Sequence, residues 1–323
     1  MKHAVLIMAH KNKEQVIRLI HALACDEFDF FVHPDIKWDL SAQDLKDIES
    51  CADNVHIASK RIHGELDHWS LPQITLNLID DALEYERNTG VKYRYFLLLS
   101  GQDYPIKSKK YILNFLEEQY PKPLIHIDDY DEEEWVRSKF MLVKWSNKID
   151  EIHNHMKVGI IRKIRVAPLV LCENFEKIVY GSPYYRLKKY NMKLYGGSAW
   201  WILPHGVMDY ISNVRNNIPG FIREFTRTWT PEETFFQTMT MNSPLINYIV
   251  DDDPIYDDDK YDQNCMTYAN FFTPQKGFSG HPYYITCEDF DRIMKKKALF
   301  ARKFDINISE RALDMIDEVI RND

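Results

Sequence analysis

The sequence lacks the long apolar stretch, of about 18 consecutive residues, that a membrane-spanning helix requires. The apolar run near the N-terminus covers only residues 4–9, which is also too short for the core of a signal peptide. Cysteine is scarce as well: there are five, none in CxxC spacing, a pattern typical of reduced thiols and not of a disulfide framework. We therefore expect a cytoplasmic protein without a membrane span, with peripheral contact at the inner face of a membrane left open.

Positive charge is in deficit. The 323 residues contain 41 Lys and Arg against 49 Asp and Glu, a net charge of −8, which argues against nonspecific binding to nucleic acid. Basic patches at 161–165 and 186–190 are local exceptions, which we interpret as solvated surface. Glycine and proline are few, at 11 and 14, and together with a hydrophobic fraction of 45% they indicate a large buried core and exclude a disordered chain.

Two glycine-rich nucleotide motifs are also missing. No GxGxxG follows the first apolar segment and no GxxxxGK[ST] occurs anywhere, which argues against a dinucleotide oxidoreductase and a P-loop ATPase. Bound phosphates would then be neutralised by side chains or by a metal ion. Aspartates at 128–129, 251–253 and 257–259 offer oxygen ligands for Mg²⁺ or Mn²⁺, although a solvated acidic loop is the simpler interpretation of 250–262. The histidines at 153 and 155 have no third ligand near them in the sequence.

What the first 130 residues do contain is a regular alternation of short apolar segments with helical patterns. The expected strands cover 5–10, 28–35, 54–59, 93–100 and 124–129, and the expected helices 14–23, 44–52, 71–85 and 111–119. Ser70, Pro72 and Gln73 predict a capping box before the third helix. Such alternation predicts an α/β fold with a mostly parallel sheet flanked by helices, in which ligands lie beyond the C-terminal strand ends. The polar residues expected at those ends are His10, His33, Asp35, Ser100, Gln102 and Asp103.

The second part of the chain is less regular. Residues 131–190 are basic and aromatic without a clear period, and 194–203 read as a strand hinged by two glycines. Residues 230–239 and 310–320 predict helices. In the segment GGSAWW, Trp200 and Trp201 would project to opposite faces of a strand, so that one joins the core and the other is available to stack on a sugar.

The segment TPEE has two interpretations. Thr230 suits an N-cap, Pro231 the first helical position and Glu233 the third, which together predict a capping box. The same placement would keep Glu233 ionised at the positive end of a helix dipole, as a general base requires. Glu232 would then contact an acceptor or have a structural role.

Taken together, these segments resemble the core-2/I-branching β-1,6-N-acetylglucosaminyltransferase family, which includes the peptide O-xylosyltransferases. The matching motifs span nearly the whole chain. They are AHKN at 9–12, FVHPDIK at 31–37, LLLSGQDYPIKS at 97–108, GGSAWWIL at 196–203, TPEETFFQTMTMNSP at 230–244 and LFARKFD at 299–305.

The resemblance implies a GT-A-like, Rossmann-type fold and an inverting transfer from a UDP-sugar, with no cofactor and no divalent metal. It implies that Glu233 is the catalytic base and that Lys303 contacts the diphosphate. An arginine that serves some relatives as a second phosphate contact is missing from 278–286, where His281 is the nearest candidate, with Lys276 and Arg302 as others. Further expected contacts are His10, Asp35 near the uridine and Asp103 for the donor, and Arg137, Trp200 and Glu232 for the acceptor.

On this basis we expect residues 1–130 to bind the nucleotide sugar and residues 131–323 to hold the acceptor and catalytic residues, fused into one domain. The favoured donor is UDP-GlcNAc, with UDP-xylose as the alternative. The acceptor would be a hydroxyl of a glycan or lipid-linked glycan, β-linked in the product, for surface polysaccharide synthesis. Animal relatives carry a membrane anchor and disulfides. We expect neither in this chain, which suggests a bacterial-type cytoplasmic enzyme. A metal-dependent phosphoesterase that uses the aspartates and a noncatalytic glycan-binding protein are the rivals.

Overall fold

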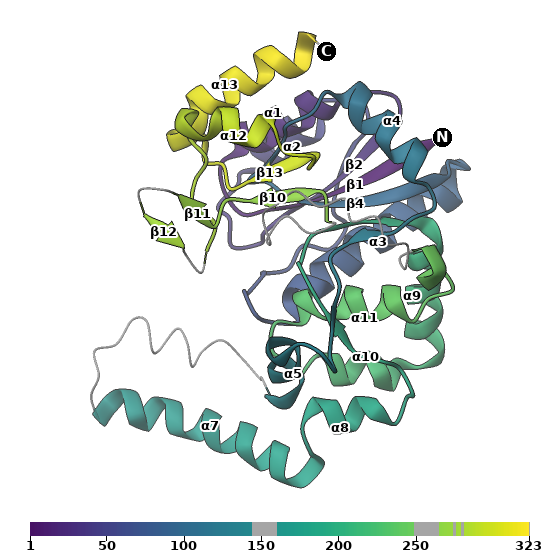
Figure 1. The fold of residues 1–323 in the computed structure, drawn as a ribbon, viewed down its shortest axis with the longest axis vertical. Helices are drawn as coiled ribbons and strands as arrows, with labels where there is room; N and C mark the ends of the chain where they lie inside the picture. Colours follow the sequence, from purple (N-terminus) through teal and green to yellow (C-terminus); the bar gives the residue numbers. More distant parts are fainter. Residues whose placement is uncertain (144–159, 249–264, 274–275, 279–280, 323) are drawn as a thin grey trace.

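The computed structural model describes residues 1–143, 160–248, 265–273, 276–278 and 281–322 (Figure 1). Its centre is a six-stranded sheet in the order β3-β2-β1-β4-β9-β6. These strands are β1 (Lys2–Ala9), β2 (Phe28–Pro34), β3 (Val55–Ile57), β4 (Tyr93–Ser100), β6 (Leu124–Ile125) and β9 (Trp201–Pro204). Strands β3, β2, β1 and β4 are parallel, whereas β9 runs antiparallel to both β4 and β6. The predicted mostly parallel α/β fold is thus confirmed.

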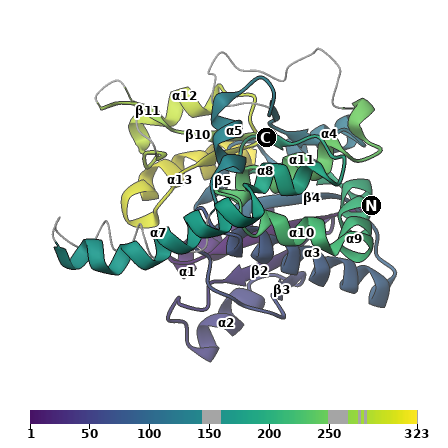
Figure 2. The same cartoon turned by 90° about the horizontal axis from the view of Figure 1, so that it is seen from below.

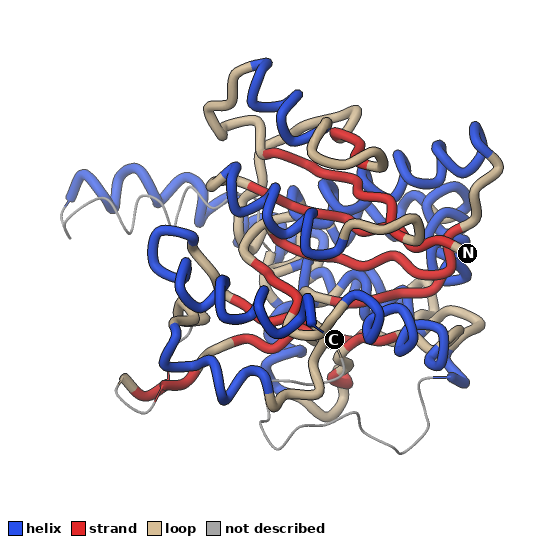
Figure 3. The backbone as a smooth tube through the Cα atoms, turned by 90° about the horizontal axis from the view of Figure 1, so that it is seen from above, coloured by secondary structure: helices blue, strands red, loops and turns tan. Residues whose placement is uncertain are grey.

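Helices cover both faces of this sheet, and Figure 3 shows them on either side of the strands. One face carries α1 (Lys13–Leu23), α2 (Ala42–Glu49), α4 (Lys109–Gln119), α12 (Phe290–Met294) and α13 (Ile306–Asn322). The other carries α3 (Ser70–Thr89), α5 (Glu134–Met141), α8 (Pro183–Lys188), α9 (His205–Asn217), α10 (Pro219–Phe225) and α11 (Phe235–Met241).

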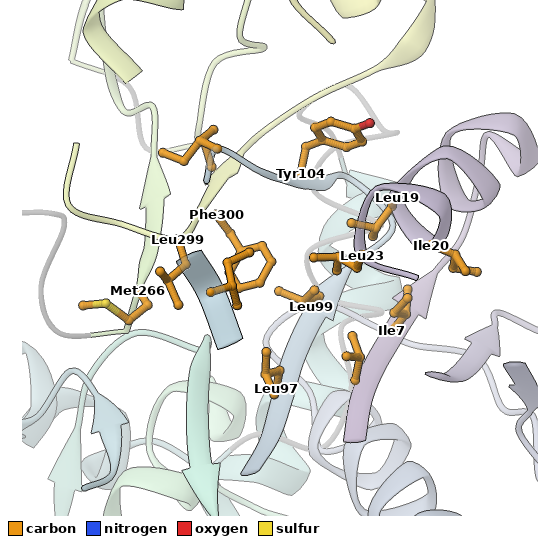
Figure 4. Close-up of a cluster of buried hydrophobic side chains, with 14 of the residues drawn as sticks. Ile7, Leu19, Ile20, Leu23, Leu97, Leu99, Tyr104, Met266, Leu299 and Phe300 are labelled. Carbon is orange, nitrogen blue, oxygen red and sulfur yellow. The ribbon is translucent and has the colours of Figure 1, made fainter. Parts of the chain in front are cut away.

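The two faces bury separate hydrophobic clusters because side chains alternate along a strand. In β1, Val5 and Ile7 join the cluster under α1, while Ala4 and Leu6 join the cluster under α3. Figure 4 shows Ile7 of β1 near residues of α1 within the first cluster. Burial on both faces explains why the central strands are nearly continuous apolar runs.

Smaller sheets and turns join distant parts of the chain. Strand β13 (Phe300–Arg302) lies between β10 (Thr267–Ala269) and β5 (Asp103–Pro105). Strand β7 (Asp128–Asp129) pairs with β8 (Tyr195–Gly196), and β11 (Phe272–Thr273) with β12 (Gly277–Phe278). The remaining elements are α7 (Ile160–Tyr180) and the 3-10 turns η1 (Pro231–Glu233), η2 (Ile246–Tyr248) and η3 (Cys287–Asp289).

Most elements predicted for the first 130 residues are present, and three predictions for the second part are wrong. Residues 131–190 were expected to be irregular, but their described part forms α5, α7 and α8. The expected strand over 194–203 is broken into β8 and β9, which belong to different sheets. The expected helix over 230–239 begins only at Phe235, after the 3-10 turn η1.

Both predicted capping boxes are also wrong. The N-cap of α3 is Trp69, without a side-chain cap, and the Ser70 hydroxyl instead accepts a hydrogen bond from the Glu65 amide at 2.8 Å. Thr230 adopts a left-handed conformation with φ 46°, which turns the chain at η1 and leaves no side-chain cap. In both places the local conformation of the preceding loop replaces the predicted cap.

The two halves expected at 1–130 and 131–323 share sheets: β9 joins the central sheet, and β5 pairs with β13. Their division of labour stays a prediction. Across the described residues, no helix is both long and apolar enough to cross a membrane.

Candidate active site

The strand order places the candidate site at the C-terminal ends of β1 and β4. The order β3-β2-β1-β4 reverses direction between β1 and β4, and in parallel sheets such a reversal opens a crevice where ligands bind. His10 follows β1, Asp35 follows β2, and Ser100 ends β4. The structure therefore brings several of the residues predicted to bind the donor to one edge of the sheet.

Two lysines meet at this edge from opposite ends of the chain. Lys11 Nζ lies 2.5 Å from Asp305 Oδ2 and donates to the Tyr284 hydroxyl at 3.3 Å. Lys303 Nζ lies 5.5 Å from the centre of the Tyr284 ring. Burial lowers the pKa of Lys303, and the charges of Arg302 and Lys11 lower it further. Burial acts on Lys11 in the same direction, but hydrogen bonds to Asp305 and Tyr284 raise its pKa overall.

His10 lies within the electrostatic influence of both lysines, and its lowered pKa keeps the imidazole neutral near pH 7. Its pKa is lowered by burial first and then by the charges of Lys11 and Lys303. We call Lys11 and Lys303 the cation cluster. Its members come from the segments 9–12 and 299–305, both of which carried the family resemblance. Such a cluster can balance the negative charge of a diphosphate.

Arg302 lies beside the cation cluster in a buried stack. Its Nε lies 3.5 Å from Asp103 Oδ1, across the β13–β5 pair, and its guanidinium lies 3.8 Å from the centre of the Trp200 ring. Asp103 is completely buried and accepts a hydrogen bond from the Ser100 amide at 2.8 Å. Burial raises the pKa of Asp103, and Arg302 opposes that shift. The geometry gives Asp103 and Arg302 a supporting role beneath the site, and their contact with a donor stays a prediction.

The two tryptophans differ in burial, but they do not take opposite faces of one strand as predicted, because β9 begins only at Trp201 and both contact the cluster under α3. Trp201 is completely buried in the core under α3, whereas Trp200 is only partly buried. One face of the Trp200 ring is covered by Arg302. Stacking on an acceptor sugar would have to use the rest of the ring, and that role stays a prediction.

Asp35 organises the loop that follows β3. Its carboxylate accepts hydrogen bonds from the amides of Lys37 at 2.8 Å and Gly64 at 2.7 Å, and His63 Nδ1 lies 3.0 Å from it. Burial alone would raise the pKa of Asp35, but these hydrogen bonds lower it, so the side chain stays ionised. Its predicted contact with uridine stays a prediction.

Glu233 lies in η1 among aromatic and basic residues. Its Oε2 is 3.4 Å from Lys139 Nζ, which lies 4.1 Å from the centre of the Trp229 ring and 5.8 Å from that of Trp135. The Glu233 side chain keeps 37% of its surface exposed, enough to reach a bound substrate. Burial raises the pKa of Glu233, and the charge of Lys139 counteracts this. A partly exposed carboxylate with a raised pKa suits a general base.

Glu232 is in a different environment from its neighbour. It is only 9% exposed, its Oε1 accepts a hydrogen bond from the Asp67 amide at 2.9 Å, and its buried Oε2 lacks a partner among the described residues. Burial raises its pKa to about 8, and the nearby carboxylates of Glu233 and Asp67 contribute. Glu232 is therefore neutral near pH 7 and anchors the loop before α3. Its predicted contact with the acceptor stays a prediction.

The turn between β8 and β9 links the two sides of the site. The Gly197 amide donates to the Glu233 carbonyl at 2.9 Å, and three residues later Trp200 stacks on Arg302. Position 197 needs glycine because a Cβ there would lie 1.9 Å from the His126 carbonyl oxygen. The backbone that fixes Glu233 thus continues directly to the support of the cation cluster.

Two further predicted residues lie in surface segments. Arg137 Nη1 donates to the carbonyls of Tyr130 and Asp131, at 3.3 and 2.9 Å, and so stabilises the chain before α5. His281 is exposed between β12 and η3. Contact of Arg137 with an acceptor and of His281 with a phosphate stay predictions.

Several aspartate and histidine clusters in the sequence are candidate metal sites. The aspartates at 251–253 and 257–259 and the histidines at 153 and 155 lie outside the described residues. Within the described residues, no group of three or more His, Cys, Asp or Glu side chains is arranged to hold an ion. Asp128 lies 3.2 Å from His126, and Asp129 lies 2.5 Å from Lys193.

Sequence reasoning missed three residues of this site. Lys11 belongs to the motif AHKN at 9–12 and directly follows the first predicted strand. Its position could therefore have indicated a residue of the site. Lys139 lies in the region expected to be irregular, and Asp67 contributes only a backbone amide to Glu232. Neither left a signal in the sequence.

Comparison with known proteins identifies the family. The model of the core-2/I-branching enzyme family matches residues 4–270, which is most of the chain. This chain belongs to the core-2/I-branching enzyme family. The resemblance inferred from the motifs is therefore confirmed, whereas these comparisons do not support the expectation of a bacterial-type enzyme.

The relatives that the comparison names have low sequence identity to this chain. Xylosyltransferase 2 of Rattus norvegicus is 22% identical over 317 residues, which cover 97% of this chain and 33% of the relative. Beta-1,3-galactosyl-O-glycosyl-glycoprotein beta-1,6-N-acetylglucosaminyltransferase 4 of Danio rerio is 25% identical, with 73% of this chain and 49% of the relative covered. Beta-1,3-galactosyl-O-glycosyl-glycoprotein beta-1,6-N-acetylglucosaminyltransferase 3 of Homo sapiens is 23% identical, and the match covers 98% of this chain and 68% of the relative. The chain thus spans about a third of the length of the xylosyltransferase that it matches.

Proposed function

We propose that this chain is an inverting glycosyltransferase that transfers a sugar from a UDP-sugar to a hydroxyl group of a glycan. Membership of the core-2/I-branching family supports the reaction class. The observation that carries the proposal is the continuous link between two chemical groups. Glu233 is joined through the Gly197 amide to the turn whose Trp200 supports Arg302, next to the cation cluster. One turn thus contacts both the proposed base and the residue next to Lys303.

The reaction follows from these positions. Glu233 takes the proton of the acceptor hydroxyl, and the oxygen attacks the anomeric carbon of the donor. The bond from that carbon to UDP breaks, and UDP leaves with the bonding electrons on its diphosphate. Lys303 and Lys11 stabilise this growing negative charge, as a divalent ion does in many other enzymes. Attack opposite the leaving group turns an α-linked donor into a β-linked product.

The donor sugar is proposed from the relatives. We favour UDP-GlcNAc, and the named xylosyltransferases among the relatives favour UDP-xylose as the second candidate. We also propose that residues 1–130 serve mainly the donor and 131–323 mainly the acceptor. All five cysteines are free, which supports a reducing, cytoplasmic location.

The test pairs two variants that should fail in different ways. Glu233→Gln removes the base, so kcat should fall by about 10²–10⁴-fold while UDP binding stays intact. Lys303→Ala removes a charged contact to the diphosphate, so UDP affinity should fall by about tenfold or more. Turnover with a panel of UDP-sugars and UDP-induced thermal shifts measure the two effects and also identify the donor.

Lys46→Ala is the matched control, because this lysine is exposed on α2 and lies outside the motifs that carry the family resemblance. It should change neither turnover nor UDP binding. Near-normal turnover of Glu233→Gln would remove the base from the mechanism. Unchanged UDP affinity of Lys303→Ala would remove the phosphate contact.

A further inference from the structure

Helix α7 exposes a stripe of large apolar side chains. Leu171, Phe175 and Ile178 are 67%, 65% and 83% exposed. Their spacing of four and three residues places them on one face of the helix. Val179 is exposed as well. An apolar stripe of this kind on a helix is typical of a surface that is covered by a partner.

The helix extends away from the body of the molecule and is attached at its C-terminal end. Figures 1 and 2 show α7 projecting beyond the end where α8 and α5 lie. The anchor is polar: Glu176, which is buried, lies 2.7 Å from Arg186 Nη1 of α8, and Arg227 Nε lies 3.9 Å from the same oxygen. Among the described residues, the large exposed fractions of the apolar stripe show that it takes little part in this attachment.

The charge around the stripe is opposite to that of the whole chain. Between positions 160 and 190 the sequence has seven basic residues and two acidic ones, whereas the whole chain has a net charge of −8. Of the basic residues whose side chains are described, Lys177, Lys188 and Lys189 are exposed, and Lys189 lies 3.6 Å from Glu224. Two exposed tyrosines, Tyr180 and Tyr185, lie at the end of α7 and in α8. Apolar, basic and aromatic residues in this combination are characteristic of helices that lie in the interface of an anionic membrane.

Charge also selects between the candidate partners. A second copy of the chain would bring two basic surfaces together, and like charges across an interface oppose association. An anionic bilayer instead attracts the lysines and buries the apolar stripe. We propose that α7 docks this protein on an anionic lipid bilayer.

The docking surface is close in the fold to the proposed catalytic base. Leu187 of α8 shares a hydrophobic cluster with Val136 and Phe140 of α5, and Lys139 of α5 contacts Glu233. Docking through α7 therefore holds the side of the site that carries Glu233 near the membrane. If the proposed glycosyl transfer is correct, which this step requires, the acceptor class is a glycan carried on a membrane lipid.

The first experiment measures sedimentation of the full chain with lipid vesicles, without substrates. We expect binding to vesicles of phosphatidylcholine with phosphatidylglycerol, weak binding to phosphatidylcholine alone, and a decrease at high salt. Protein that stays in the supernatant with both vesicles would overturn the proposal.

Variants then test the surface itself. Leu171→Ser, Phe175→Ser and Ile178→Ser together should weaken vesicle binding at least about a hundredfold, because three large apolar side chains no longer insert. The control replaces Ile308 and Val319, exposed on α13, by serine and should bind as the wild type does. Lys177→Glu with Lys188→Glu should weaken binding by about tenfold or more, and Lys46→Glu with Lys297→Glu should not.

Two further measurements separate the possible outcomes. Sedimentation velocity without lipid should show the same monomeric species for wild type and triple serine variant. A wild-type dimer that the triple variant abolishes, together with absent vesicle binding, would assign the stripe to a second copy and overturn the proposal. UDP binding, measured by thermal shift, reports on the proposed function independently of vesicle binding.

Discussion

At the residue scale, two neighbouring glutamates have been given different properties by their surroundings. Glu233 is partly exposed and paired with Lys139, whereas Glu232 is buried against the Asp67 amide. A neutral Glu232 places no second negative charge beside Glu233. Separating the pKa values of two adjacent acids in this way is how one site holds a base and a structural acid together.

The titration of Glu232 should appear in the stability of the fold. Its pKa is about 8 in the folded protein and 4.5 ordinarily, so between these values the folded state binds the extra proton. Stability therefore falls as the pH rises through this window. Glu232→Gln cannot ionise and keeps an oxygen for Asp67, so its stability relative to the wild type should grow from about pH 5 to about pH 8 and then level off.

Urea unfolding at a series of pH values measures this difference. Glu288→Gln, at an exposed site in η3, is the control and should show a flat difference. A flat difference for Glu232→Gln too would contradict a neutral Glu232.

Lys139 should act on the pH dependence of catalysis. Its charge counteracts the burial that raises the pKa of Glu233. Lys139→Met removes the charge and keeps the length of the side chain, so the pKa of Glu233 should rise. Because the base works when ionised, the acidic limb of the kcat/KM profile should move to higher pH. Lys193→Met, which removes the partner of Asp129, is the control. An acidic limb in the same place for Lys139→Met and wild type would exclude this role.

The roles of these residues were predictable from the sequence to different degrees. Glu233 stood out because TPEE and its family resemblance indicated the same carboxylate. Lys139 and Asp67 could not be found, because their contacts depend on how α5 and the loop before α3 pack. A buried carboxylate such as Glu232 is recognisable only once its burial is known.

At the element scale, the short strand β13 divides the work of adjacent residues. Arg302 turns inward to Asp103 of β5 and to Trp200, while Lys303 lies at the cation cluster. The buried side chain of Arg302 thus fixes the position of Lys303, the next residue in the chain. The pairing of β13 with β5 joins residues about 200 positions apart, which no local pattern predicts.

Removing the counter-ion of this strand should destabilise the protein. Asp103→Asn leaves the buried guanidinium of Arg302 without a negative partner, so the free energy of unfolding should fall by about 3–5 kcal/mol. UDP binding should weaken as well, because β13 positions Lys303. The double variant with Arg302→Gln should recover part of the stability, because no charge is then buried alone. Chemical denaturation measures both, and an Asp103→Asn variant as stable as the wild type would contradict the supporting role.

The elements themselves were predictable where the period was clear. The strands at β1, β2 and β4 are nearly continuous apolar runs, so their burial was visible in the sequence. Helices α5 and α8 were missed because they are short, with eight and six residues, and α7 was missed because large apolar residues such as Phe175 and Ile178 are exposed and do not mark a buried face. The same property marks α7 as a docking surface.

At the scale of the whole molecule, the site is assembled from both ends of the chain. Lys11 lies in the connection between β1 and α1 and Lys303 precedes the last helix, yet both contact Tyr284. The antiparallel strand β9 and the small sheet around β13 close the site over a parallel sheet. Under the proposed mechanism, the fold thus brings together the positive charges that stabilise the leaving diphosphate.

This arrangement predicts catalysis without a divalent ion. The cation cluster brings the ammonium groups of Lys11 and Lys303 to Tyr284 near the end of β1, where they can stabilise the leaving diphosphate in place of Mg²⁺ or Mn²⁺. Transfer activity of the full chain should be the same in EDTA and after adding Mn²⁺. Lys303→Ala should lower kcat in both conditions alike, because no metal shares its work. A sharp requirement for Mn²⁺ in the wild type would contradict this prediction. It would indicate that a bound ion, held by the aspartates at 251–253 and 257–259, stabilises the leaving group instead of the cation cluster.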